Sequence, residues 1–253
     1  MNTVKVKNII IGEGRPKICV PISAKTKREI IAEALSLSNM SIDLVEWRVD
    51  WFEDAYSISS ISEILKLLTK ALGNIPLLFT FRTSGEGGEK VIEAKAYAEL
   101  NKTVAATGLV DMIDIEVSAG DELVKEIIKD AHASGVKIIL SNHNFKNTPG
   151  SEAIINKLRK MQDLGADITK IAVMPQSKLQ VLELLKASVV MTEKYADRPT
   201  IAIAMGKVGV ISRLAGEVFG SAITFGAINK ASAPGQIFAA DLNKILELLH
   251  KNL

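Results

Sequence analysis

A lysine lies inside an apolar run in the segment DITKIAVMPQ, residues 167–176. The neighbours of Lys170, among them Ile168, Ile171 and Val173, are typical of a strand buried on both faces. A buried ammonium group is unfavourable unless it is paired or loses its proton. Lys170 is therefore either a buried ion-pair partner or an amine that can attack a ketone and form a Schiff base.

A Schiff base acidifies the neighbouring C–H, and a general base must then remove that proton. His143, in the run KIILSNH, is the candidate because imidazole titrates near neutral pH. A carboxylate such as Glu86 could hold the other ring nitrogen and fix the tautomer. We interpret GEGG, at 85–88, as a mobile loop that frees Glu86 to approach the site.

More charged residues stand at the ends of other apolar runs, some of them two apart and so on one face of a strand. They are Glu46, Arg48, Arg82, Asp114, Glu116 and Arg213. Each could be part of a buried ion pair, and Asp114 or Glu116 could serve only to balance Lys170. Taken together, these groups predict a site for an anionic, hydroxylated substrate.

Eight short apolar runs could position these side chains. They begin at residues 17, 44, 76, 112, 137, 168, 199 and 222. The stretches between them have apolar residues three and four apart, as amphipathic helices do. Several of these helices should end near a glycine, namely Gly73, Gly108, Gly135 and Gly165. Thr148 and Pro149 predict an N-cap and a first helical residue.

Eight strands alternating with eight helices predict an α/β fold, a (β/α)8 TIM barrel that forms a single catalytic domain over residues 1–253. The functional residues of such a barrel lie at the carboxyl ends of its strands. A doubly wound sheet is less favoured, because SAKTKREI rather than a glycine-rich loop follows the first run. The segment VKVKNIIIGEGR, before Lys17, predicts a β-hairpin that closes the lower end.

Composition excludes several classes of function. A net charge of +2 and 5% aromatic residues do not suit nucleic-acid binding. Without a signal peptide or a spanning apolar run, we expect a cytoplasmic protein that does not enter a membrane. Cys19 is alone and should be an inert buried thiol, and His132 and His250 fall in helical stretches away from His143, so we expect no metal.

Several motifs resemble those of the type I 3-dehydroquinate dehydratases, over essentially the whole chain. They are EWRVD (46–50), FTFR (79–82), EGGE (86–89), SNHNF (141–145), KIAVMPQ (170–176), GVISRLAGEVFGSAITFG (209–226) and SAPGQ (232–236). The resemblance implies that Lys170 forms an iminium with the ketone of 3-dehydroquinate. It also implies that His143, oriented by Glu86, removes the adjacent proton and protonates the departing hydroxyl.

The resemblance further implies a set of substrate contacts. The carboxylate would be bound by Arg213, Ser232 and Gln236, the ring hydroxyls by Glu46, Arg48 and Arg82, and the apolar walls would be Met205 and Phe225. Loop 229–236 would close as a lid. No cofactor or metal is implied, and the family suggests a homodimer.

Three positions depart from the commonest family pattern. They are Pro21, where a serine is usual, Ile203 in the strand that contains Met205, and Asn144, where aspartate is usual. Two alternatives remain open at this point. One is a class I Schiff-base aldolase on the same barrel, and the other is a non-catalytic barrel that binds a small anion.

Overall fold

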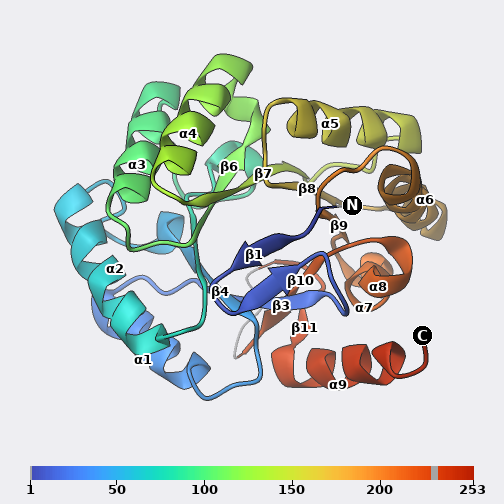
Figure 1. Ribbon diagram of the computed structural model, residues 1–253, viewed down its shortest axis with the longest axis horizontal. Coiled ribbons are helices and arrows are strands. Elements are labelled where there is room, and N and C mark those ends of the chain that lie inside the picture. The colour runs from blue at the N-terminus through green and yellow to red at the C-terminus, as the bar shows by residue number, and fades with distance from the viewer. Residues whose placement is uncertain (1, 229–232) are drawn as a thin grey trace.

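Eight parallel strands curl into a barrel with helices around it (Figure 1). The computed structural model describes residues 2–228 and 233–253, so Ser232 and half of the predicted lid, residues 229–232, lie outside the described residues. The eight strands are β3 (Lys17–Ile22), β4 (Leu44–Arg48), β5 (Leu77–Thr80), β6 (Met112–Glu116), β7 (Lys137–Asn144), β8 (Ile168–Val173), β9 (Thr200–Ala204) and β10 (Ile223–Ala227). All eight predicted runs form strands, which confirms the predicted TIM barrel.

Helices follow the strands and cover the outside of the barrel (Figure 1). They are α1 (Lys27–Leu37), α2 (Ile58–Leu72), α3 (Ala94–Ala106), α4 (Asp121–Ala133), α5 (Ser151–Asp163), α6 (Lys178–Lys194), α7 (Ile211–Leu214), α8 (Gly216–Phe219) and α9 (Ala239–His250). A short strand, β11 (Ile237–Phe238), pairs with β10.

The predicted helix ends are mostly confirmed. Gly73, Gly108, Gly135 and Gly165 all have positive φ just beyond α2, α3, α4 and α5. The predicted start of α5 is wrong. Its N-cap is Gly150, which has an extended backbone, and its first residue is Ser151, so Thr148 and Pro149 lie in the irregular segment before the helix.

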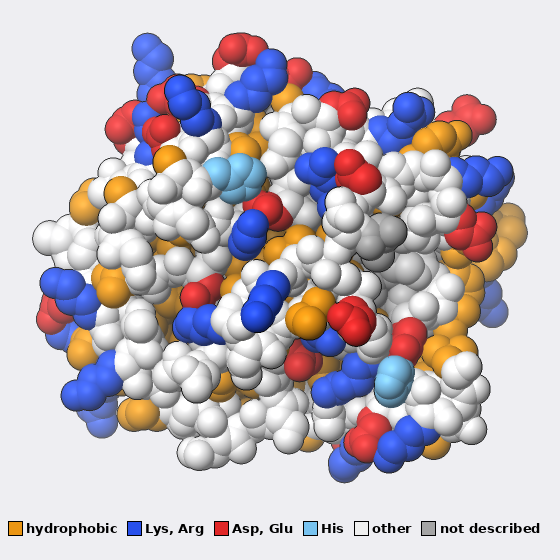
Figure 2. All heavy atoms as spheres, viewed as in Figure 1, with side chains coloured by type: hydrophobic (Ala, Val, Ile, Leu, Met, Phe, Trp, Pro, Cys, Tyr) orange, Lys and Arg blue, Asp and Glu red, His pale blue; other side chains and the backbone are white. Residues whose placement is uncertain are grey.

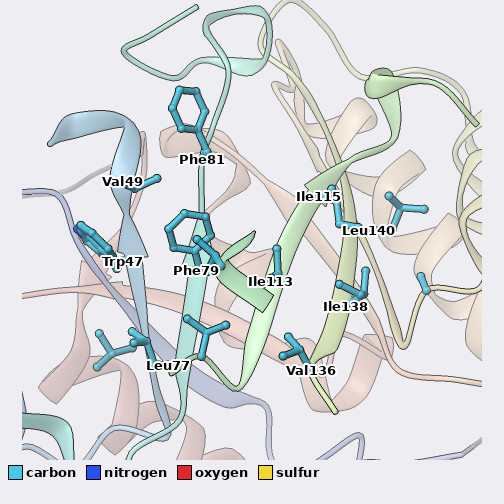
Figure 3. Packing of buried hydrophobic residues seen from close by; sticks show 14 of the residues in the cluster. Trp47, Val49, Leu77, Phe79, Phe81, Ile113, Ile115, Val136, Ile138 and Leu140 are labelled. Carbon is cyan, nitrogen blue, oxygen red and sulfur yellow. The ribbon is translucent and has the colours of Figure 1, made fainter. Parts of the chain in front are cut away.

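The outward-facing residues of the strands form the larger apolar core. Trp47, Phe79 and Ile113 are fully buried and pack with other strand residues between the barrel and its helices (Figure 3). The aromatic rings of Trp47 and Phe79 meet nearly edge to face, with 5.9 Å between centroids. Because alternate residues of a strand point to opposite faces, the residues between them fill the barrel interior.

The barrel interior is filled in layers, as expected for this fold. The lowest layer, from β4, β6, β8 and β10, consists of Leu44, Met112, Ile168 and Ile223. The next layer, from the other four strands, consists of Cys19, Leu78, Ile139 and Ile201. Two residues further along the first set of strands stand Glu46, Asp114, Lys170 and Phe225. The interior therefore changes from apolar to charged at its third layer.

A β-hairpin made by β1 (Val4–Val6) and β2 (Ile9–Ile11) lies across the lower end of the barrel (Figure 1). Val4, Val6 and Ile11 are buried against the two apolar layers. Charged side chains of both signs are interspersed on this face of the molecule (Figure 2). The predicted closure of the lower end is confirmed.

The barrel closes between β9 and β10 with little backbone pairing. One bridge, between Thr200 and Ser221, joins the two sides. The Ser221 hydroxyl accepts a hydrogen bond from the Ala202 N–H at 3.1 Å, and the Ser212 hydroxyl accepts one from the Ala204 N–H at 2.9 Å. Serine side chains thus satisfy donors of β9 that a neighbouring strand would otherwise satisfy. We call this junction the seam.

Candidate active site

A cavity opens at the carboxyl ends of the strands, above the charged third layer. It is lined by Glu46, Arg48, Arg82, Glu86, Gly87, His143, Phe145, Lys170, Ala172, Ile203, Met205, Arg213, Phe225, Ala233 and Gln236. The described residues that the resemblance implies for catalysis and substrate binding are all in this set, whereas Asp114 and Glu116 are not. Parallel strands bring them together because all their carboxyl ends meet at the same end of the barrel.

Lys170 reaches this cavity from the centre of β8 and is only 3% exposed. Its Nζ atom donates to Oδ2 of Asp114 at 2.8 Å and lies 4.4 Å from the centroid of the Phe225 ring. The sequence left open whether Lys170 is an ion-pair partner or a reactive amine. The structure shows the ion pair, with Asp114 rather than Glu116, and also places the amine at the cavity.

His143, at the end of β7, is held by Glu86. Its Nδ1 atom lies 3.0 Å from Oε2 of Glu86, and its backbone N–H donates to the same oxygen at 2.8 Å. An ionised carboxylate only accepts, so Nδ1 carries the hydrogen and the lone pair is on Nε2. Burial, followed by the charges of Arg82 and Lys170, holds the pKa of His143 well below its usual value. The imidazole is therefore a neutral base at neutral pH.

Glu86 is fixed in place by its loop. It lies in a 3₁₀ turn, Ser84–Glu86, and accepts hydrogen bonds from Ser118 at 2.8 Å and Asn142 at 3.0 Å. Burial and the charge of Glu116 raise its pKa. A Cβ atom on Gly88 would lie 1.8 Å from the Arg82 carbonyl oxygen, so only glycine allows the loop to return this closely.

In this structure Glu86 already contacts His143, so the movement predicted for the GEGG loop is not needed to bring the two together. Asp50 holds the loop that contains Glu86 in this position. Its carboxylate accepts the backbone N–H groups of Arg82 and Glu89 and binds the Arg48 guanidinium with two hydrogen bonds of 2.8 and 2.7 Å. These contacts fix the conformation of the loop in the structure, which its glycine-rich composition alone did not indicate.

Arg82 is the centre of a buried ionic network. It donates to Asp114 at 2.7 Å, to Glu116 at 3.0 Å and to the Ser141 hydroxyl at 3.0 Å. Burial opposes its charge, but Asp114 and Glu116 outweigh this effect and raise the pKa of Arg82 well above its usual value. Arg82 thus remains a cation that is largely neutralised by the protein itself.

Arg213, on α7 beside the seam, has a different environment. Its side chain is 1% exposed, and in the described part of the chain it donates hydrogen bonds to the carbonyl oxygens of Phe225, at 3.4 Å, and Pro234, at 3.0 Å. Among residues 2–228 and 233–253 no carboxylate forms an ion pair with it, and its Nε atom has no hydrogen-bond partner. Burial lowers the pKa of Arg213 to about 10. A buried cation without an acidic partner is suited to binding an anionic ligand.

Comparison with known proteins agrees with this geometry. The family model described as type I 3-dehydroquinase matches residues 18–253. The chain belongs to this family. The 3-dehydroquinate dehydratases of Clostridioides difficile strain 630 and Escherichia coli O9:H4 strain HS are 54% and 53% identical to it. The alignments span 99% of this chain and 98% and 100% of those proteins.

Solved structures of the type I 3-dehydroquinase family superpose on the whole chain. The type I enzyme of Clostridium difficile with covalently modified comenic acid gives a TM-score of 0.98 at 54% identity, over 100% of this chain and 99% of that chain. The enzyme of Enterococcus faecalis gives 0.91 at 42% identity, over 97% and 98%. Family membership favours a dehydratase over the two alternatives that the sequence left open.

The three departures from the family pattern differ in their consequences. Ile203 lines the cavity beside Met205, whereas Pro21 is not among the lining residues. Asn144 faces a turn, where its side chain bonds to Asn147 at 2.7 Å and accepts the Lys146 N–H at 2.9 Å. The change from aspartate at 144 therefore removes a charge from this turn, and in the described part of the chain the Asn144 side chain forms no hydrogen bond with His143.

Several site residues were not singled out from the sequence. Phe145 lines the cavity, and its ring occupies the space that a Cβ atom on Gly87 would need, at 2.3 Å. Asp50, Ser118 and Asn142 support Arg48 and Glu86 from outside the cavity. Asp50 and Asn142 stand inside the quoted motifs EWRVD and SNHNF, so the motifs contained this signal. Ser118 carried none.

No helix in the described ranges is long and apolar enough to cross a membrane.

Proposed function

We propose that the chain converts 3-dehydroquinate into 3-dehydroshikimate and water through a Schiff base on Lys170. One observation carries the proposal: the same cavity is lined by a buried lysine, a neutral histidine and a buried arginine that has no acidic partner among the described residues. The lysine supplies the nucleophile, the histidine the base and the arginine a site for a carboxylate.

The reaction begins when the Lys170 amine attacks the ring ketone. The proton that the Lys170 ammonium gives up to become the attacking amine is taken up again by the carbinolamine hydroxyl, so that water leaves and a protonated iminium remains on Nζ. His143 Nε2 then removes a proton from the neighbouring carbon, and the electron pair forms a neutral enamine. As the enamine expels the β-hydroxyl group, His143 returns the proton to it, so that water leaves and a conjugated iminium forms. Hydrolysis releases the enone and restores the amine.

Binding residues would orient the ring for this sequence of steps. Arg213 with Gln236, and Ser232 as predicted from the sequence, would hold the carboxylate. Glu46, Arg48 and Arg82 would contact ring hydroxyls. Because Arg82 already donates to Asp114 and Glu116, we assign it mainly an electrostatic role. Met205 and Phe225 provide the apolar walls.

We further propose that the chain acts as a cytoplasmic homodimer. Support comes from the family resemblance and from exposed apolar residues on α6 and the adjoining turn at Lys207–Gly209. Leu179, Leu182 and Val208 are 74%, 58% and 45% exposed. An exposed apolar surface of this kind suits association with a second copy. Light scattering after size-exclusion chromatography should give twice the 27.3 kDa chain mass, and a mass of one chain would contradict the proposal.

The activity is tested by adding 3-dehydroquinate and following enone absorbance in the near ultraviolet. Borohydride is then added, and the reduced adduct is mapped by mass spectrometry. We expect absorbance to rise and the adduct to lie on Lys170. No absorbance change would overturn the proposed reaction, and an adduct on another lysine would overturn the assignment of the nucleophile.

A further inference from the structure

The nitrogen of Lys170 lies between an acid and an aromatic ring. Oδ2 of Asp114 accepts its hydrogen bond at 2.8 Å, and the face of Phe225 lies 4.4 Å away on the cavity wall. Both neighbours stabilise positive charge at Nζ. Asp114 is fully buried and is not among the residues that line the cavity, so it contacts the lysine from below rather than the substrate.

The two oxygens of Asp114 have separate partners. Oδ1 binds Nη2 of Arg82 at 2.7 Å and accepts from the Ser141 hydroxyl at 2.6 Å, whereas Oδ2 contacts only Lys170 in the hydrogen bonds that the structure describes. Burial opposes the charge of Asp114, but Arg82 and Lys170 outweigh it and keep its pKa well below the usual value. Asp114 therefore stays a carboxylate and does not act as the base.

The charge on Nζ at each step of the reaction shows what the Asp114 carboxylate contributes. An ammonium group and a ketone become an iminium and water, so Nζ carries one positive charge before and after this step. The enamine is neutral at the same nitrogen, and the conjugated iminium that follows is charged again. A fixed carboxylate at Oδ2 therefore matches every charged form of Nζ without moving.

We propose that Asp114 is the counter-ion of the Schiff base on Lys170, holding the same nitrogen as ammonium and as iminium. The inference rests on the proposed function. Other titratable groups around this nitrogen are Cys19 on β3, Glu46 and Arg48 on β4, Arg82 just after β5, Glu86 in the turn that follows it, His143 on β7 and Arg213 on α7. None of them forms a hydrogen bond or ion pair with Nζ in the described part of the chain.

The test compares two buried carboxylates of β6 that both bind Arg82. Asp114→Asn removes the charge that contacts Nζ. Glu116→Gln is the matched control, because Glu116 binds Arg82 at 3.0 Å and has no contact with Lys170. Acetic anhydride labels Lys170 only as the free amine, and the labelled peptide is quantified by mass spectrometry across pH. Thermal unfolding first confirms that each variant is folded.

In the absence of substrate, Asp114→Asn should lower the pH of half-maximal labelling by at least about one unit, since a close opposite charge favours the charged form by about 1–3 units. Glu116→Gln should lower it by less than a third as much. An unchanged midpoint in Asp114→Asn, or an equal shift in both variants, would overturn the assignment.

The same variants are then incubated with 3-dehydroquinate and trapped with borohydride. For Asp114→Asn, the pH above which the adduct is lost should fall by about one unit, because its iminium lacks a counter-ion. Wild-type protein that forms no adduct would overturn the proposed function, while the labelling result without substrate would still decide the role of Asp114.

A structure of the trapped wild-type protein provides a test that needs no variant to fold. Oδ2 of Asp114 should remain about 3 Å from Nζ, as expected for a charge-assisted hydrogen bond. A separation beyond about 4 Å, with the carboxylate turned away, would overturn the inference.

Discussion

The cavity has two unlike sides. Along β5 to β8 each charged side chain has a partner of opposite charge or a hydrogen bond, and the pairing of β7 with β8 is continuous from Ile139 and Ile168 to Asn144 and Val173. Across the seam between β9 and β10 the backbone meets at one bridge. There Arg213 has no acidic partner among the described residues.

The difference indicates that one side of the cavity serves the chemical steps and the other serves substrate binding. Groups that make and break bonds are held in their final geometry before substrate arrives, which avoids reorganisation during the reaction. On the carboxylate-binding side, no described carboxylate of the protein neutralises Arg213. The carboxylate of the substrate supplies this negative charge. Each prediction below tests whether one side can be changed without the other.

The largest effect is expected from Lys170→Met. Turnover should fall by at least about 10⁴-fold, as for the loss of a nucleophile, because no iminium can form. Binding of 3-dehydroshikimate, measured by calorimetry, should change by less than about fivefold, since Arg213 is untouched. Equal losses of turnover and binding would show that the two sides are not separable.

His143→Ala should lower kcat by about 10²–10⁴-fold through loss of the general base. It should still give a borohydride-trapped adduct on Lys170, because imine formation uses the lysine amine. Stopped-flow absorbance and mass spectrometry on the same sample measure both quantities. Near-normal turnover in this variant would exclude His143 as the base.

Arg213→Ala should act on binding. We expect kcat/KM to fall by about 100-fold, mainly through KM, because a desolvated charge contact with the substrate is lost. Arg213→Lys is the matched control and should recover part of the loss, since it keeps the charge but not the guanidinium geometry. Steady-state kinetics measures both constants. A fall in kcat as large as the fall in kcat/KM would contradict the assignment of Arg213 to the binding side.

Ser221→Ala tests the seam. It leaves the Ala202 N–H without its acceptor in a buried place, so the free energy of unfolding should fall by about 1–3 kcal/mol. Denaturant unfolding measures the change, and the exposed Ser134→Ala serves as control with an effect below about 0.5 kcal/mol. Equal effects for the two serines would mean that the seam contact adds nothing.

The smallest effect concerns pH. Burial and the charges of Arg82 and Lys170 lower the pKa of His143, so its neutral form persists below the ordinary imidazole value of 6.5. Between about pH 7.5 and 6.5, kcat should therefore fall by less than about twofold. A pH profile in which kcat halves close to 6.5 would show that His143 is not depressed by its surroundings.

The sequence predicted the barrel, its eight strands and its hairpin because these depend on local patterns. Alternation in LVEWR and MIDIE already marked which side chains face inward. Helix ends at Gly73 and Gly135 depend on a backbone conformation that glycine adopts easily. The start of α5 was missed because Thr148 and Pro149 are equally compatible with an extended approach to the helix.

Which side chains pair across different strands was harder to predict from the sequence. Sequence spacing could not decide whether Asp114 or Glu116 binds Lys170, because both point inward from β6 and only the stagger of the strands separates them. The conformation of the Glu86 loop is supported by Asp50, more than thirty residues away in the chain. The absence of an acidic partner for Arg213 is a property of the packed molecule that no local pattern contains.

The thiol of Cys19 can report on opening of the barrel. It stands in the second apolar layer on β3, paired in register with Phe225 of β10. Burial, followed by the charge of Glu46, raises the pKa of this thiol well above its ordinary value. It can therefore react with an alkylating reagent only when the barrel opens. The rate at which this single thiol is modified in native buffer would measure how often the barrel comes apart.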